Sequence, residues 1–344
     1  MSRALPPGKI DPDLLVECLA LCPTSGPDVL VGPGPGEDAA AVISHENTII
    51  VKSDPVTFAT DRIGWYAVHV AANDVATRGA DPRWLLLTVL LPHLGATEEV
   101  TRTVFRQVGD ACRELGVVLV GGHTEVTGAV GRPVVSASML APAPGGRVLC
   151  TRDARPGDVL VMTRHCPIEG SAILARELRE VLAARGVAEE TLDRAASFLD
   201  DPGISVVAAA HAVRGVPGVH ALHDPTEGGV LCGLWEVALA AGLSVDVDVG
   251  AIPISPEGAA ICHALVLDPL RTIASGSLLI SCAQESADDA IQRLAAAGIP
   301  SAVIGTVLSS GRPTVFAGDP ANTLPFVVRD ELTRAFGEVS AEGA

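Results

Sequence analysis

Six acidic residues stand beside glycines or at the ends of apolar runs, where their carboxylates could hold a magnesium ion. They are Glu37, Asp38, Asp54, Asp74, Asp224 and Glu227. Carboxylate oxygens that bind a phosphate-bound Mg²⁺ are typical of that ion's chemistry. We therefore expect a magnesium site that serves a nucleotide. The plain alternative is that such acids merely end their strands in solvent.

The residues 38–44 and 48–54 form two short, apolar-rich runs around the polar residues 45–47, which predicts a hairpin. If Ser44 faces Thr48, Asp38 lies directly opposite Asp54. Like charges opposite each other on adjacent strands are destabilising. A cation between the two carboxylates would remove that penalty, so the predicted register supports a metal site.

Glycine-rich stretches accompany the acids. Gly34 and Gly36 alternate with prolines ahead of the hairpin, and a strand follows them, so this is not a dinucleotide fingerprint, which needs a helix next. A backbone of this kind could lie close against a phosphate or an adenine, or it could be an ordinary surface loop.

Two more glycine pairs follow predicted strands. We expect the strand 117–120 to end in a turn at 121–125, which holds many potential ligands. In HDPTEGGV (residues 223–230) a strand ends at Asp224 and Thr226 caps the next helix, while two glycines expose N–H groups that attract phosphate. A capped strand-to-helix turn is the alternative. The expected nucleotide-binding residues are Gly34, Gly36, Lys52, Asn73, Gly121, Gly122, His123, Thr124, Thr226, Gly228 and Gly229.

Regular elements must position these residues. The apolar periodicity predicts helices over 11–22, 61–78 and 97–115, and strands over 84–91 (buried) and 133–141. Asn73 and Asp74 lie off the apolar stripe of the second helix, which would be a solvated face if that helix stood alone.

The second half alternates strands with helices, which indicates a layered α/β or α+β domain. The expected strands are 158–163, 218–223, 244–249, 277–282, 302–307 and 314–317; the expected helices are 168–185, 189–199, 203–213, 227–241, 256–263 and 284–297. A linker at 142–157 places the domain boundary near Arg152. We therefore expect domains over 1–151 and 152–330, and a frayed polar tail over 331–344.

Bulk properties limit the function classes. The chain has 344 residues, 48% hydrophobic and 19% charged, which suits two globular domains. A net charge of −17 argues against nucleic-acid binding. No apolar run is long enough for a membrane helix and no signal peptide is visible, so we expect a cytoplasmic protein with no membrane partner. The cysteines have no zinc-site spacing, and only Cys166 is a candidate nucleophile; a buried thiol is the plainer account of it.

Six ordered motifs resemble the AIR synthase superfamily: GPGPGEDAAAV, KSDPVTF, HVAANDVATRGADPRWLLLTVLLP, GGHTEV, HDPTEGGV and ASGSLLIS. That family includes phosphoribosylaminoimidazole synthetase, thiamine-monophosphate kinase, selenophosphate synthetase and the hydrogenase-maturation protein HypE. The resemblance covers roughly residues 30–310 and is strongest to the HypE branch. It implies two AIR synthase-like α/β (α+β) domains, a homodimer whose N-terminal strands build a shared barrel, and Mg·ATP at the domain cleft.

The resemblance also implies roles for single residues. In the thiamine-monophosphate kinase pattern, the positions of Glu37, Asp38, Asp54 and Asp74 carry magnesium, and Asp224 and Glu227 match further acids. We expect Asp54, Asp74 and Asp224 to be catalytic as well. In the GG-x-T turn His123 stands where that kinase and HypE have aspartate, and Glu125 could substitute.

The function expected from these features is a HypE-like, Mg²⁺-dependent enzyme that uses ATP to phosphorylate a carbonyl or phosphate oxygen of an unidentified small substrate. HypE ends in a Pro-Arg-Ile-Cys tail, whereas the last cysteine here is Cys282, so we expect no reaction on a tail cysteine. The alternatives are a thiamine-monophosphate-kinase-like phosphotransferase and a non-catalytic nucleotide-binding protein.

Overall fold

The computed structural model describes residues 12–21, 24–44, 47–56, 61–309 and 312–342. The chain divides into two compact units. The N-terminal unit comprises Ser25–Gly32 and Asp38–Val148, and the C-terminal unit comprises Met1–Thr24, Pro33–Glu37 and Leu149–Ala344. The main boundary thus falls close to the linker that the sequence indicates. In addition, the glycine–proline stretch before Asp38 belongs to the C-terminal unit, which the sequence did not suggest.

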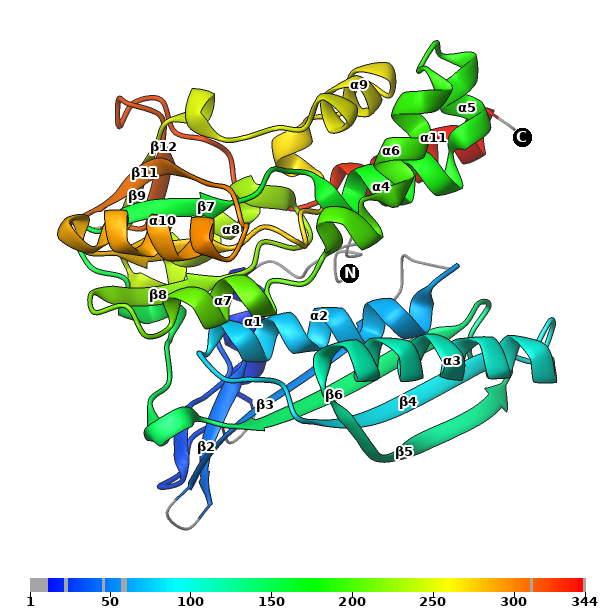
Figure 1. Ribbon diagram of the computed structural model, residues 1–344, viewed down its shortest axis with the longest axis horizontal. Coiled ribbons are helices and arrows are strands. Elements are labelled where there is room, and N and C mark those ends of the chain that lie inside the picture. The colour runs from blue at the N-terminus through cyan, green and yellow to red at the C-terminus, as the bar shows by residue number, and fades with distance from the viewer. Residues whose placement is uncertain (1–11, 22–23, 45–46, 57–60, 310–311, 343–344) are drawn as a thin grey trace. The chain divides into compact units, whose positions relative to one another are not determined.

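The N-terminal unit is a six-stranded sheet covered by two helices (Figure 1). Its elements are β1 (Val29–Val31), β2 (Ala40–Ser44), β3 (Asn47–Val56), α2 (Ile63–Thr77), β4 (Trp84–Pro92), α3 (Glu98–Leu115), β5 (Val118–Thr127) and β6 (Val134–Pro142). The strand order is β1-β2-β3-β6-β4-β5, and only β4 and β5 pair in parallel. Helix α2 packs on β3, β6 and α3.

The hairpin of β2 and β3 forms, but its register differs from the expected one. Ser44 pairs with Asn47 and Ala40 with Val51, one residue away from the assumed alignment. Strand β2 begins only at Ala40, so Asp38 precedes it, and Asp54 pairs with Ala137 of β6 instead. The prediction that Asp38 lies opposite Asp54 was therefore wrong. Residues 45 and 46 of the connection lie outside the described residues.

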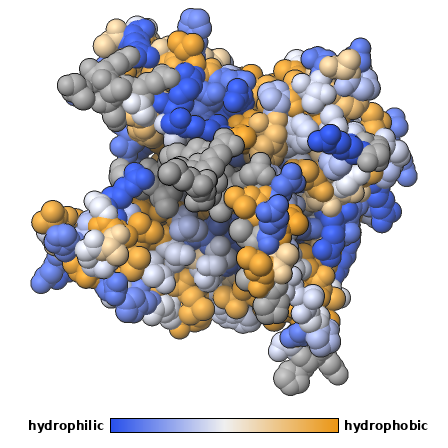
Figure 2. All heavy atoms as spheres, turned by 180° about the vertical axis from the view of Figure 1, so that it is seen from behind, coloured by the Kyte–Doolittle hydropathy of each residue, from blue (hydrophilic) through white to orange (hydrophobic). Residues whose placement is uncertain are grey.

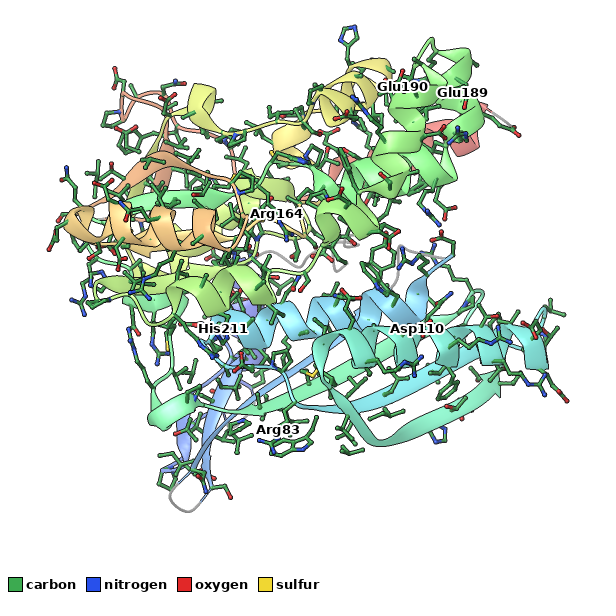
Figure 3. All side chains as sticks on the ribbon, in the orientation of Figure 1. Arg83, Asp110, Arg164, Glu189, Glu190 and His211 are labelled. Carbon is green, nitrogen blue, oxygen red and sulfur yellow. The ribbon has the colours of Figure 1, made fainter. Side chains whose placement is uncertain are left out.

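Helix α2 is buried on nearly all sides, whereas α3 is amphipathic. Asn73 and Asp74 are 0% and 5% exposed, so neither lies on a solvated face. In α3 the Thr97 hydroxyl caps the first turn by accepting from Val100 N–H, and charged side chains such as Asp110 cover the outer face (Figure 3). A helix like α2, which has no solvated stripe, needs apolar or paired residues all round.

The C-terminal unit holds a second six-stranded sheet, in the order β12-β9-β11-β7-β10-β8, with only β12 and β9 parallel. Its strands are β7 (Val159–Thr163), β8 (Val219–His223), β9 (Ser244–Val247), β10 (Leu279–Cys282), β11 (Ser301–Leu308) and β12 (Thr314–Phe316). Its helices are α1 (Pro12–Leu19), α4 (Ile168–Glu177), α5 (Arg179–Ala184), α6 (Glu189–Ser197), α7 (Val207–Val213), α8 (Gly229–Ala241), α9 (Pro256–Ala264), α10 (Ala287–Ala296) and α11 (Glu331–Glu342).

Helices cover both faces of this second sheet. Helix α8 packs on β9 and β12, and α10 packs on β7, β11 and α7. All four residues of β10 are buried, which requires cover on both sides. The core on one face joins α8 to Leu160, Met162 and Leu279 of the sheet.

Several expected elements are corrected. The single helix over 168–185 is two helices that break at Leu178. The frayed tail is wrong: α11 is a helix whose Leu332 and Ala335 are buried. Strand β4 is not buried throughout, because Leu86 is 42% exposed.

Hydrophilic and hydrophobic residues are interspersed on the face that Figure 2 shows. No described helix is long and apolar enough to cross a membrane.

Candidate metal and nucleotide site

In the N-terminal unit Lys52 connects two of the expected acids. Its Nζ lies 3.3 Å from Asp54 Oδ2 and 3.3 Å from Asp74 Oδ2. Lys52 and Asp54 are two apart on β3, so both side chains lie on the same face of the sheet. Because α2 packs on β3, it brings Asp74 to that face. Lys52 thus pairs with Asp54 and Asp74, and Asp38, whose carboxylate lies near that of Asp74, completes an acidic cluster that contains one ammonium group.

The charge of this cluster perturbs Asp74. The pKa of Asp74 is raised to about 8, mainly by burial and also by the nearby carboxylates of Asp54 and Asp38, while Lys52 opposes the rise. One carboxylate oxygen of Asp38 and one of Asp74 lie within 4.8 Å of each other. Closely spaced carboxylate oxygens whose negative charge exceeds that of the one nearby ammonium group suit a small divalent cation.

Arg78 positions Asp38, and the sequence analysis missed this role. The side chain is 0% exposed, and its Nε donates a hydrogen bond of 3.0 Å to the carbonyl of Ala39. The end of α2 is thereby tied to the residue that follows Asp38. The signal was present in NDVATRG, since an arginine directly after a buried apolar helix must find acceptors.

The GGHTE stretch does not form the expected strand-end turn. Residues 118–127 are one continuous edge strand, β5, and every residue of it from Val118 to Val126 is exposed. Gly122 has φ +147°, and a Cβ there would meet Leu87 O at 1.9 Å, so close pairing with β4 requires this glycine. His123 Nε2 lies 3.2 Å from Glu125 Oε2, with both side chains exposed. Roles of Gly121, Gly122, His123 and Thr124 toward a nucleotide stay a prediction.

In the C-terminal unit, the residues 33–37 lie against helix α8. Gly36 has φ +80°, and a Cβ there would lie 2.3 Å from Glu236 O, so this contact accounts for the glycine. The Glu37 side chain is 7% exposed and lies 3.8 Å from the guanidinium of Arg152. Gly34 has open space around its Cα. Of the two glycines in this stretch that were expected to bind nucleotide, Gly36 therefore has a structural explanation and Gly34 has none.

The HDPTEGGV turn connects β8 to α8 as expected, but its details differ. Asp224 is 3% exposed at the end of β8. The N-cap residue of α8 is Gly228 and not Thr226, so this helix has no side-chain cap. The Thr226 carbonyl accepts from the N–H groups of Gly229 and Ala274. The expected Thr226 cap was therefore wrong.

The glycines of that turn are required by packing. A Cβ on Gly229 would meet Leu270 O at 2.4 Å, and one on Gly228 would meet Cys232 Cβ at 2.7 Å. The N–H of Gly228 is already used, since it donates to Asp330 Oδ2 at 2.6 Å. The Gly229 N–H donates to the Thr226 carbonyl, so the expectation of bare N–H groups was wrong for both glycines. The carboxylate of Asp330 takes the position beside the Gly228 N–H that was expected for a phosphate.

Two buried acids beside this turn were missed by the sequence analysis. The pKa of Asp330 is raised to about 7, mainly by burial and in part by the charges of Glu227 and Glu331. The pKa of Glu169, in the first turn of α4, is likewise raised to about 8, mainly by burial and in part by the charges of Glu227 and Asp330. An acid inside the apolar run IEGSAIL was the available signal for Glu169.

The loop beside Glu169 is held by Arg164, at the end of β7 (Figure 3). Its guanidinium donates to the carbonyls of Gly203, Ser205 and Gly276. Ser275, next to that loop glycine, is 1% exposed. Arg164 thereby fixes the backbone that carries Ser275.

Family models match both halves of the chain. The AIR synthase related protein N-terminal domain matches residues 36–142, and the C-terminal domain of the same description matches residues 155–318. The chain belongs to the AIR synthase family. The expected two-domain α/β (α+β) fold is thereby confirmed.

Individual relatives fall mainly in the HypE branch. Carbamoyl dehydratase HypE of Cupriavidus necator is 31% identical over 75% of this chain and 71% of its own. A solved E. coli HypE is 25% identical with a TM-score of 0.71, covering 94% of this chain and 99% of that one. A HypE solved in complex with ATP is 26% identical with a TM-score of 0.70, covering 85% and 88%. These relatives support an ATP-using, AIR synthase-like function.

Proposed function

We propose that this chain is a HypE-like, Mg²⁺-dependent enzyme that uses ATP to phosphorylate a carbonyl or phosphate oxygen of a small substrate. The observation that carries the proposal is the cluster of Asp38, Asp54 and Asp74 around Lys52. Three carboxylates around one ammonium leave net negative charge in a half-buried place. That excess suits a cation that brings phosphate oxygens with it.

Each residue of the cluster has a distinct task in this proposal. Asp38, Asp54 and Asp74 would hold magnesium, which supplies charge neutralisation at the phosphates. Lys52 opposes the rise in the pKa of Asp74 and offers a compact positive charge to a phosphate oxygen. Arg78 holds the backbone beside Asp38. Catalysis of phosphoryl transfer depends mostly on such positioning and charge stabilisation.

The acids of the C-terminal unit are the second part of the proposal. Glu37, Asp224 and Glu227 lie on two loops of that unit, at residues 33–37 and 224–228. We propose that they bind magnesium or phosphate, and that Gly34, Gly121, Gly122, His123, Thr124 and Asn73 line the nucleotide. Variants of Asp224 and Glu227 test this part separately from Asp74.

The test is ADP release with Mg²⁺ across carbamoyl, thiamine-phosphate and purine-precursor substrates. Asp74→Asn should abolish release, whereas the matched control Asp110→Asn, which is exposed on α3, should not. ATP should raise the melting temperature with Mg²⁺ and much less with EDTA, because a ligand that binds only the folded state stabilises it. Equal shifts in both conditions, or full activity of Asp74→Asn, would contradict the proposal.

We also propose a homodimer that forms through the N-terminal unit. Strands β2, β3 and β4 lie inside the sheet, with a paired neighbour on each side. The edge strands are the three-residue β1 and the longer β5, and on β5 Val118, Leu119, Val120 and Val126 are exposed. An exposed apolar edge strand of this length needs cover, and a second copy that extends the sheet or closes a barrel would supply it.

The dimer is tested by light scattering on the purified chain. Val120→Lys with Val126→Lys should give a monomer, because charges on the edge prevent pairing. The control Val303→Lys changes an exposed valine on β11 of the C-terminal unit and should leave the mass unchanged. A monomeric wild-type chain at micromolar concentration would refute the dimer.

A further inference from the structure

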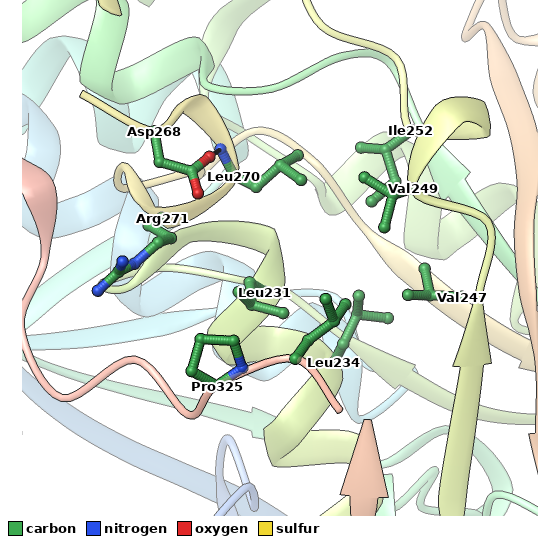
Figure 4. Close-up of a pocket in the computed structure, with 10 residues that line it drawn as sticks. Leu231, Leu234, Val247, Val249, Ile252, Asp268, Leu270, Arg271 and Pro325 are labelled. Atoms are coloured by element: carbon green, nitrogen blue, oxygen red, sulfur yellow. Dashed lines mark hydrogen bonds between the residues drawn. The ribbon is translucent and has the colours of Figure 1, made fainter. Parts of the chain in front are cut away.

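The C-terminal unit contains an apolar pocket that is distinct from the acidic clusters. It has a volume of about 210 Å³ (Figure 4). Leu231 and Leu234 of α8 form its floor, and Val247, Val249 and Ile252 form one wall. Leu234 is 0% exposed, and Leu231, Val247 and Ile252 are also buried. The pocket is therefore an interior cavity with an opening, and not a surface depression.

Opposite the aliphatic wall, the pocket carries one charge of each sign. Asp268 and Arg271 both line it, from the turn that precedes β10, and they lie on the same side in Figure 4. Asp268 Oδ1 accepts from the N–H of Leu270 at 2.9 Å, which fixes the carboxylate at the start of that turn.

Arg271 is incompletely paired. Its Nε is buried and donates no hydrogen bond to any described residue. The nearest carboxylate oxygen, Glu331 Oε1, lies 3.9 Å away, and the other oxygen of that group accepts from Arg334. A buried guanidinium donor without an acceptor is costly, so a ligand carboxylate would be stabilised there. The side chain is 37% exposed, and Figure 4 shows its guanidinium directed away from the aliphatic wall, so pairing with a ligand carboxylate requires the side chain to turn toward the pocket.

The combination of size and charge specifies the ligand. An apolar cavity of about 150 Å³ takes benzene, so this pocket has room for a branched aliphatic or phenyl group. A neutral apolar ligand would leave Arg271 without an acceptor. A simple anion would place its charge beside Asp268 as well. A zwitterion with an apolar side chain satisfies both charges and the wall.

We propose that this pocket binds a free hydrophobic α-amino acid, such as leucine or phenylalanine. The side chain lies among Leu231, Leu234 and Val247. The α-carboxylate pairs with Arg271 and the α-ammonium group with Asp268. This site is independent of nucleotide binding, so its test does not depend on the proposed enzymatic function.

The test is isothermal titration of the purified chain with L-leucine and L-phenylalanine, without nucleotide or metal. We expect saturable binding, weakened at least ~10-fold, about 1.4 kcal/mol, by Arg271→Gln and by Asp268→Asn. Asparagine keeps an oxygen that can accept from Leu270 N–H, so the second variant removes only the charge. Val249→Trp, at a residue that is 37% exposed, should fill the mouth and abolish binding. Arg293→Gln, which breaks an exposed pair on α10, is the matched control.

Truncated ligands separate the three contacts. Isoamylamine lacks the carboxylate, 4-methylpentanoate lacks the ammonium group, and glycine lacks the side chain, so each should bind at least ~10-fold more weakly than leucine. Absence of binding by leucine and phenylalanine up to roughly 10 mM would overturn the site. The zwitterion assignment would be overturned if 4-methylpentanoate bound as tightly as leucine. It would also be overturned if Arg271→Gln and Asp268→Asn, shown by circular dichroism to be folded, bound leucine as the parent chain does.

Discussion

Replacing Glu169 by glutamine should stabilise the C-terminal unit at alkaline pH and change the pH dependence of its stability. Glu169 is 5% exposed in α4, and burial raises its pKa from 4.5 to about 8. The charges of Glu227 and Asp330 contribute to this rise in pKa, and a hydrogen bond with Ser275 opposes it. The folded state therefore holds the proton that the unfolded state loses near pH 4.5.

The sign and the size follow from this difference. Between about pH 4.5 and pH 8 the folded chain binds more protons at Glu169 than the unfolded chain, so stability falls as pH rises. At about 1.4 kcal/mol for each unit of pKa, the ionisable side chain costs the folded state roughly 3–5 kcal/mol above pH 8 and less than ~1 kcal/mol at pH 5. Glutamine has a similar shape and no charge. The gain from Glu169→Gln should thus be about 3 kcal/mol larger at pH 8 than at pH 5.

Urea denaturation at both pH values measures the effect. Trp235 lies in the C-terminal unit, so its fluorescence reports on that unit in a background of Trp65→Phe and Trp84→Phe. Glu177→Gln, on an exposed position of the same helix, is the matched control and should show no such change. A difference between Glu169→Gln and its parent that is independent of pH would refute the reasoning. A variant that is less stable at pH 8 would refute it too.

Three further predictions concern single side chains. Asp158 is 2% exposed and accepts hydrogen bonds from His220, from a serine hydroxyl and from a backbone N–H. Asp158→Asn should therefore lower the free energy of unfolding, measured by urea denaturation, by about 2–4 kcal/mol. A loss below ~1 kcal/mol would contradict this prediction. Arg78→Met should lower the apparent affinity for Mg·ATP, measured from the rise in melting temperature, at least ~10-fold, because the carbonyl of Ala39 beside Asp38 loses its hydrogen-bond donor. An unchanged rise in melting temperature would argue against that role of Arg78. Cys166 is 0% exposed and burial raises its pKa to about 12, so Cys166→Ser should keep any substrate-dependent ATP turnover, and its loss in a folded variant would show a thiol role.

The sequence by itself determined most elements and the residue types of the acidic cluster. Apolar periodicity and glycine or proline breaks are local properties, so α2, α3, β4 and the strand-to-helix pairs of the second half were predicted close to their observed places. The motif order also pointed to the AIR synthase family, which the family models confirm. Helix α11 was missed because its sequence is short and mostly polar. Its buried residues include Leu332 and Ala335, which are too few to give a clear apolar periodicity.

Only the tertiary structure decided which residues meet. A shift of one residue in the β2–β3 register removed the facing aspartates, and the packing of α2 on β3 brought Lys52 to Asp74 instead. Register depends on pairing partners far along the chain, so no local pattern specifies it. The glycines at 228 and 229 likewise read as phosphate contacts in sequence. In the fold they are required by the close approach of Cys232 and of the Leu270 backbone, which no spacing in the sequence could reveal.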